Sequence, residues 1–149
     1  MTSVETGIMA GYLVALSVFG IALLLGLWPE GHQLTKDESK VYILWRVMQI
    51  KRERHLLVIV TVMGVLGGAT HSLWWLALEE LKTGQVVWYV AQPLLGCVVS
   101  LFFYGLVRGG LITGSDGSKD LNVYGVAGLA GLVGYSAYEV LDKILGIVR

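Results

Sequence analysis

Residues 54–112 decide the fold: RHLLVIVTVMGVLGGATHSLWWLALEELKTGQVVWYVAQPLLGCVVSLFFYGLVRGGLI. Two apolar runs, 55–78 and 86–107, contain no Asp, Glu, Lys or Arg, and a short polar link at 79–85 joins them. A helix needs roughly 20 residues to cross a hydrocarbon core of about 30 Å, so each run is long enough to span a membrane. The stretch therefore predicts an antiparallel helical hairpin in a lipid bilayer.

The composition of the whole chain agrees with lipid as the solvent. Of its 149 residues, 55% are hydrophobic and 15% are charged, whereas an average globular chain is about a quarter charged. Eleven basic and eleven acidic residues cancel, which argues against a nucleic-acid partner. The single cysteine, Cys97, excludes an intrachain disulfide and a cysteine-built metal site within one subunit.

Two further apolar segments flank the hairpin, at 7–28 and 123–140. Glu5 and the lack of any basic residue before the first segment favour a retained helix over a cleaved signal peptide. The second has glycine at every third position from Gly125 to Gly134, which suits a helix packed inside a bundle or at a subunit contact. It either crosses the membrane fully or re-enters it. The predicted fold is all-α, a single membrane domain with four transmembrane helices.

The long polar loop at 29–54 sets the orientation. It holds six of the eleven basic residues, and loops rich in Lys and Arg stay in the cytoplasm. The 29–54 loop and the 108–121 link are then cytoplasmic, and the N-terminus and the 79–85 link lie outside. Within the loop, the helical spacing of Val41, Leu44, Trp45 and Met48 predicts a cytoplasmic amphipathic helix on the membrane surface. The alternative is an extension of the next span into water.

Small residues at four-residue spacing predict close helix contacts, because helices in lipid associate through packing rather than through the hydrophobic effect. Each of the last three predicted spans carries such residues. The candidate helix-packing positions are Gly64, Gly68 and Ser72 on the second span, Gly96 on the third, and Gly128 and Gly131 on the fourth.

His71 and Gln92 are the candidate polar residues inside the hairpin. If the helices run antiparallel about a turn centred near Lys82, His71 lies level with Gln92 and Pro93, and a His71–Gln92 contact would join the two helices. Pro93 also frees a backbone carbonyl one turn earlier, near Tyr89. An imidazole in a membrane helix either relays protons or forms a structural hydrogen bond.

Three more charged residues are candidates for function, and all lie at helix ends. Arg108 near the inner surface either extends to lipid headgroups or binds an acidic partner. Glu79 and Glu80 in the outer link either terminate the helix or attract cations to the mouth of a pore.

Several short motifs lie between residues 53 and 145: ERHLL at 53–57, GGATH at 67–71, Trp88-Tyr89 with Pro93 and Gly96, Tyr104 with RGGL at 108–111, and the segment 122–134. Together they resemble a family of small bacterial multi-pass inner-membrane proteins. The resemblance leaves out the first helix. It implies a bacterial inner-membrane setting, and no site residue is carried over from it.

The sequence contains no motif with a catalytic mechanism: no HExxH, no CxxC, no phosphate-binding glycine loop and no plausible Ser/His/Asp set. We therefore expect no enzyme activity and no cofactor. Two functions stay open. The first is a homo-oligomeric channel-like or transport assembly, because four thin helices cannot enclose a pore alone. The second is an accessory or scaffold subunit that binds another membrane protein through the fourth helix and the basic loop.

Overall fold

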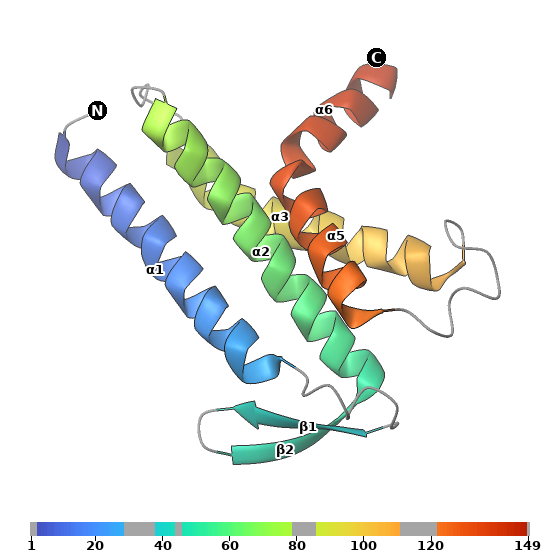
Figure 1. Ribbon diagram of the computed structural model, residues 1–149. Coiled ribbons are helices and arrows are strands. Elements are labelled where there is room, and N and C mark those ends of the chain that lie inside the picture. The colour runs from blue at the N-terminus through green and yellow to red at the C-terminus, as the bar shows by residue number, and fades with distance from the viewer. Residues whose placement is uncertain (1–2, 29–37, 44–45, 79–85, 111–121, 149) are drawn as a thin grey trace.

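The computed structural model describes residues 3–28, 38–43, 46–78, 86–110 and 122–148 (Figure 1). Helices dominate this part of the chain, and one β hairpin lies beside them. The elements are α1 (Ser3–Leu27), β1 (Glu38–Ile43), β2 (Arg46–Lys51), α2 (Arg52–Leu78), α3 (Val86–Arg108), α5 (Val123–Tyr135) and α6 (Ala137–Val148).

Three helices are long and apolar enough to cross a membrane, at Val4–Leu27, Glu53–Leu78 and Val86–Arg108. They agree within a few residues with the predicted spans 7–28, 55–78 and 86–107. The protein is thus a multi-pass membrane protein, as the uncharged runs predicted, and its apolar helices suit a lipid bilayer.

The predicted amphipathic helix after residue 41 is wrong, and so is its alternative, a helical extension of the second span. The segment forms an antiparallel pair of strands in which Val41 lies opposite Met48 and Tyr42 opposite Val47. The spacing of Val41 and Met48 fits a helix, but β-branched and aromatic residues are dense here, and such residues favour strands. Helix α2 begins only at Arg52, directly after β2.

The predicted fourth helix over 123–140 is two helices. Helix α5 ends at Tyr135 after 13 residues, and α6 begins at Ala137. At 1.5 Å per residue α5 is roughly 20 Å long, which is shorter than a hydrocarbon core. Figure 1 shows α6 leaving α5 at an angle. The break at Ser136 therefore divides the predicted span.

Helix ends next to the 111–121 segment carry recognisable caps. At the end of α3, Gly110 has a φ of 77°, a left-handed conformation that glycine adopts without strain and that terminates helices. Its N–H donates to the Val107 carbonyl. At the start of α5, the Asn122 side chain accepts a hydrogen bond from the Tyr124 N–H at 3.0 Å. These caps set where α3 stops and α5 starts.

The centre of the bundle is a junction of three glycines from three helices: Gly64 of α2, Gly96 of α3 and Gly134 of α5. A Cβ atom on Gly64 would lie 2.7 Å from the Gly96 carbonyl oxygen, and Cβ atoms on Gly96 or Gly134 would each meet the Gly64 carbonyl oxygen. Only glycine permits three backbones to approach this closely. We call these residues the glycine junction.

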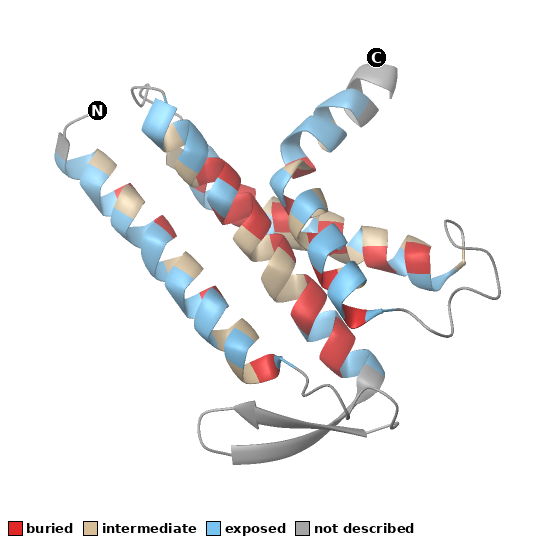
Figure 2. Cartoon of the chain, viewed as in Figure 1, coloured by how far each residue is buried: buried red, intermediate tan, exposed pale blue. Residues whose placement is uncertain are grey.

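Helix α2 lies at the centre of the fold and α1 at its edge. In Figure 2 buried residues recur along α2, while α1 is largely exposed. One buried cluster joins α1, α2, α3 and α5 at the end near the β hairpin: Leu27, Leu56, Ile59, Val60, Tyr104, Val123, Ala127 and Ala130. A smaller one, formed by Met9, Leu13 and Tyr89, joins α1 to α3 at the opposite end. The exposed face of α1 is free for lipid.

Candidate binding pocket

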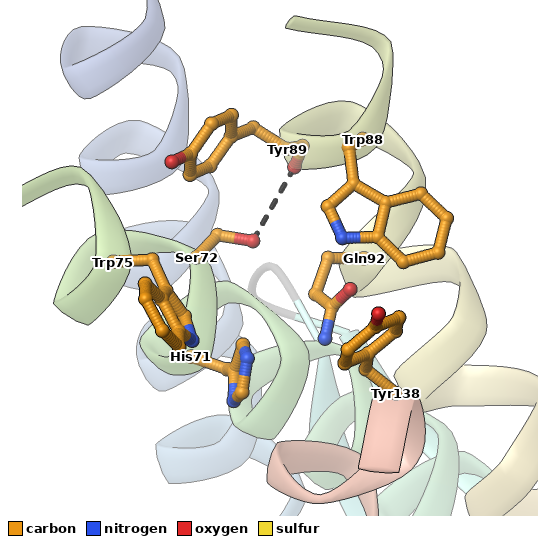
Figure 3. A pocket seen from close by; sticks show the side chains of 7 residues that line it. All are labelled: His71, Ser72, Trp75, Trp88, Tyr89, Gln92 and Tyr138. Carbon is orange, nitrogen blue, oxygen red and sulfur yellow. Dashed lines mark hydrogen bonds between the residues drawn. The ribbon is translucent and has the colours of Figure 1, made fainter. Parts of the chain in front are cut away.

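A pocket of about 280 Å³ opens between α2, α3 and α6, toward the end that carries the 79–85 link (Figure 3). It starts about two turns before the end of α2, so it lies inside the predicted membrane but near its surface. The residues lining it are His71, Ser72 and Trp75 from α2, Trp88, Tyr89 and Gln92 from α3, and Tyr138 from α6. The pocket therefore combines polar side chains with aromatic walls.

Gln92 is the most deeply buried polar side chain of the pocket, at 1% exposure. Neither its amide oxygen nor its amide nitrogen has a hydrogen-bond partner among the described residues. An unpaired polar group in a membrane interior is costly, because no solvent is present to satisfy it. The Gln92 amide is therefore available to bind a polar group that enters the pocket.

His71 lies opposite Gln92 and is 7% exposed. Its ring packs edge-on against Tyr135 at a centroid distance of 5.0 Å and also contacts Trp75. The Glu139 carboxylate lies near enough to the ring for an electrostatic interaction. The Nδ1 of His71 is buried and has no hydrogen-bond partner among the described residues.

The predicted His71–Gln92 contact is not made through a hydrogen bond, although both residues line the same pocket. The hairpin register explains the difference. The backbone of Gln92 and Pro93 lies against Gly68 rather than against His71. Three residues along a helix correspond to about 4.5 Å, so the helices are offset by nearly one turn from the predicted pairing.

Ser72 supports the carbonyl that Pro93 leaves without its helical partner. Pro93 lies inside α3 and has no N–H to donate to the Tyr89 carbonyl one turn earlier. The Ser72 hydroxyl donates to that carbonyl over 3.5 Å, a long and therefore weak bond. From the sequence, Pro93 was expected to free a backbone carbonyl at this depth. Ser72, one of the predicted helix-packing residues, donates a hydrogen bond to that carbonyl.

Two buried polar contacts elsewhere join the helices. The Ser100 hydroxyl donates to the Ala130 carbonyl at 2.7 Å and connects α3 to α5. The His55 ring Nε2 donates to the Leu27 carbonyl at 2.6 Å and connects α2 to the last turn of α1. Sequence reasoning missed His55 because it stands at the first position of an apolar run, where it resembles a boundary residue.

Arg108 pairs with Glu53 at 2.7 Å, with side-chain exposures of 41% and 71%. The sequence predicted a headgroup or an acidic partner protein for Arg108; the structure supplies an acid from the start of α2. An exposed ion pair stabilises by at most about 1 kcal/mol, so the contact orients the helix ends more than it stabilises them. Glu79 and Glu80 lie outside the described residues, and their role at a mouth stays a prediction.

Most predicted packing residues are at helix contacts. Gly64 and Gly96 belong to the glycine junction, Gly68 packs on the Gln92 and Pro93 backbone, and a Cβ on Gly131 would lie 2.9 Å from the Met63 side chain. Gly128 differs: a Cβ there would meet nothing within 4 Å. Gly128 faces outward from α5.

Comparison with protein-family models, with curated proteins and with solved structures finds no match for this chain. The bacterial setting therefore rests on the motif resemblance alone. Within the described ranges no group of three His, Cys, Asp or Glu side chains is placed to hold a metal ion. The described residues of the pocket offer two polar groups for binding, the Gln92 amide and the His71 Nδ1, between aromatic walls.

Proposed function

We propose that the protein is the subunit of a homo-oligomeric transport or channel-like assembly in a bacterial inner membrane, with no catalytic role. The observation that carries the proposal is the Gln92 amide, which is buried at 1% exposure without a partner at the edge of an open pocket. Polar groups inside membrane helices mark the paths of polar solutes. In this proposal Gln92 and His71 bind the solute where it enters or leaves the membrane.

Oligomerisation is supported by the outward face of α5. Gly128 has open space around it, and glycine at a lipid-facing position exposes backbone where an apolar side chain would contact lipid. A second copy packed on this face would bury that backbone, as the glycine junction does within one subunit. The three long spans, α5 and α6 are too few to surround a solvated path alone, so in this proposal the path runs between copies.

The fourth crossing and the orientation belong to the same proposal. Ring contacts join Tyr124 to Trp28 near the β-hairpin end and Tyr138 to Trp88 near the opposite end. Residues 123–138 thus cover the depth of α3 despite the break, which supports a full crossing. With the 29–54 segment in the cytoplasm, the pocket opens toward the outside. Labelling of Lys40→Cys and Lys82→Cys variants from the same side of the membrane would overturn this topology.

The mass of the protein in mild detergent separates this function from the scaffold alternative. A discrete multiple of the subunit mass is expected, with Gly128→Leu dissociating it and the exposed-site control Gly105→Leu leaving it intact. Gly105 also has nothing within 4 Å of a Cβ, but it lies on α3. Stable purification as a monomer with an unlike membrane protein would instead support the accessory subunit.

Planar bilayers test the path itself. The native oligomer should conduct, and Gln92→Met should reduce conductance because it removes the polar group while keeping the side-chain length. If Glu79 and Glu80 form a cation-attracting mouth, the double variant Glu79→Gln/Glu80→Gln loses cation preference. If the double variant conducts with unchanged cation preference, the channel-like assembly is supported and the role of Glu79 and Glu80 at its mouth is rejected. No conductance from folded oligomer would overturn the transport function.

A further inference from the structure

The walls of the pocket are aromatic on three sides. Trp75 comes from α2, Trp88 and Tyr89 from α3, and Tyr138 from α6. Trp88 and Tyr138 meet edge to face, with ring centroids 5.1 Å apart, and Figure 3 shows them beside the Gln92 amide. The negative faces of such rings attract cations, and several rings around one cavity are the arrangement that binds organic ammonium groups.

The charges around the pocket favour a cation as well. No Lys or Arg is among the residues that line it. The nearest described charge that acts on the site is the carboxylate of Glu139, one residue after Tyr138, which interacts with His71. An anion would meet this carboxylate and the ring faces, and the described residues that line the pocket include no basic side chain to balance them. A protonated amine would be attracted by both.

The unpaired atoms supply acceptors for an N–H donor. The Gln92 amide oxygen has no partner. The buried Nδ1 of His71 also has no partner among the described residues, and in the neutral tautomer that carries its hydrogen on Nε2 it accepts a hydrogen bond. Two acceptors from α2 and α3 therefore border one cavity, and an ammonium group carries up to three donors.

We propose that the pocket between α2, α3 and α6 binds a small organic cation with a protonated amine, held by Gln92 and His71 and enclosed by Trp75, Trp88 and Tyr138. The cavity of about 280 Å³ is just below the range of drug-sized sites, so the ligand is a compact amine with an apolar body. The claim that this amine is the transported solute rests on the proposed transport function. The claim that the pocket binds an amine is tested separately, by direct binding measurements.

Isothermal titration calorimetry on the purified protein in mild detergent tests the inference with three probes of one shape: benzylammonium, benzyl alcohol and benzoate. Benzylammonium should bind at least tenfold more tightly than the neutral and the anionic probe. Equal affinity for the alcohol, tighter binding of benzoate, or no binding of benzylammonium at millimolar concentration would each overturn the inference, and none of these results depends on a variant.

Variants locate the site. Gln92→Met and Trp75→Leu should each weaken benzylammonium binding at least tenfold. Trp74→Leu is the matched control, because Trp74 is the neighbouring tryptophan on α2, exposed and absent from the pocket. Unchanged affinity in Gln92→Met and Trp75→Leu, or equal losses in the Trp74 and Trp75 variants, would place binding elsewhere and overturn the assignment.

The two proposals fail in different measurements. Benzylammonium binding by a protein that conducts nothing in planar bilayers would support the pocket and overturn the transport function. Conductance without benzylammonium binding would overturn the cation assignment and leave the transport function standing.

Discussion

Replacing Gly68 by alanine tests whether the close approach of α2 and α3 holds the bundle together. A Cβ atom on Gly68 would lie 2.5 Å from the Gln92 carbonyl oxygen and 2.9 Å from the Pro93 Cα. Ordinary contact of a Cβ atom begins at 3.4 Å. Because both obstacles are backbone atoms, no side chain can rotate away, and the helices must separate by several tenths of an ångström.

Such a separation has a predictable size in free energy. Overpacking of a close-packed site costs about 1–3 kcal/mol, and contact with backbone on both atoms favours the upper half, about 2–3 kcal/mol. A gap of 0.5–1 Å along the seam also forfeits a quarter to a half of each dispersion contact. Against this, alanine in place of glycine favours the helix by up to about 1 kcal/mol.

Gly105→Ala is the matched control, because it makes the same exchange on α3 where nothing lies within 4 Å. It measures the helix propensity alone. The expected difference in the free energy of unfolding between the two variants is therefore about 2–3 kcal/mol. The assay is unfolding by SDS in mixed micelles, followed by far-ultraviolet circular dichroism. Equal SDS midpoints for Gly68→Ala and Gly105→Ala would refute the reasoning.

Three further substitutions test polar contacts in the same unfolding assay. Ser100→Ala removes the buried bond to the Ala130 carbonyl and should destabilise by about 0.5–1.5 kcal/mol; an unchanged midpoint would show that the bond contributes nothing. His55→Phe removes the donor to the Leu27 carbonyl and should cost about 1–3 kcal/mol, with earlier proteolysis of α1 as a second readout; unaltered cleavage would contradict this role. Gln92→Met should raise stability by about 1–2 kcal/mol because it removes an unpaired amide, and a loss of stability would mean that Gln92 already has a partner.

The sequence predicted the membrane hairpin well because the signal was physical and local. The runs 55–78 and 86–107 are uncharged over the length of a bilayer, and few alternatives fit such runs. The glycine spacing also located three partners of the packing contacts, Gly64, Gly68 and Gly96. Close approach of two helices requires small residues at the contact, and this requirement appears in the sequence as glycine at four-residue spacing.

The site was only partly predictable, because it depends on contacts between distant segments. His71 and Gln92 were expected at one depth, but the offset of the helices depends on how α2 and α3 pack, with Gly68 against the Gln92 and Pro93 backbone. Tyr138 could not be assigned to the pocket, since the break at Ser136 that directs α6 toward α3 has no proline to announce it. The β hairpin was missed because Val41 and Met48, seven residues apart, fit one face of a helix and are also paired positions of a hairpin.

The glycine junction also implies an order of biogenesis. Gly134 of α5 rests on Gly64 of α2, and its own carbonyl lies against Gly96 of α3, so the seat for α5 does not exist until the hairpin of α2 and α3 has closed. Helix α5 is too short to span a bilayer by itself. We therefore expect α5 to insert only onto a completed hairpin.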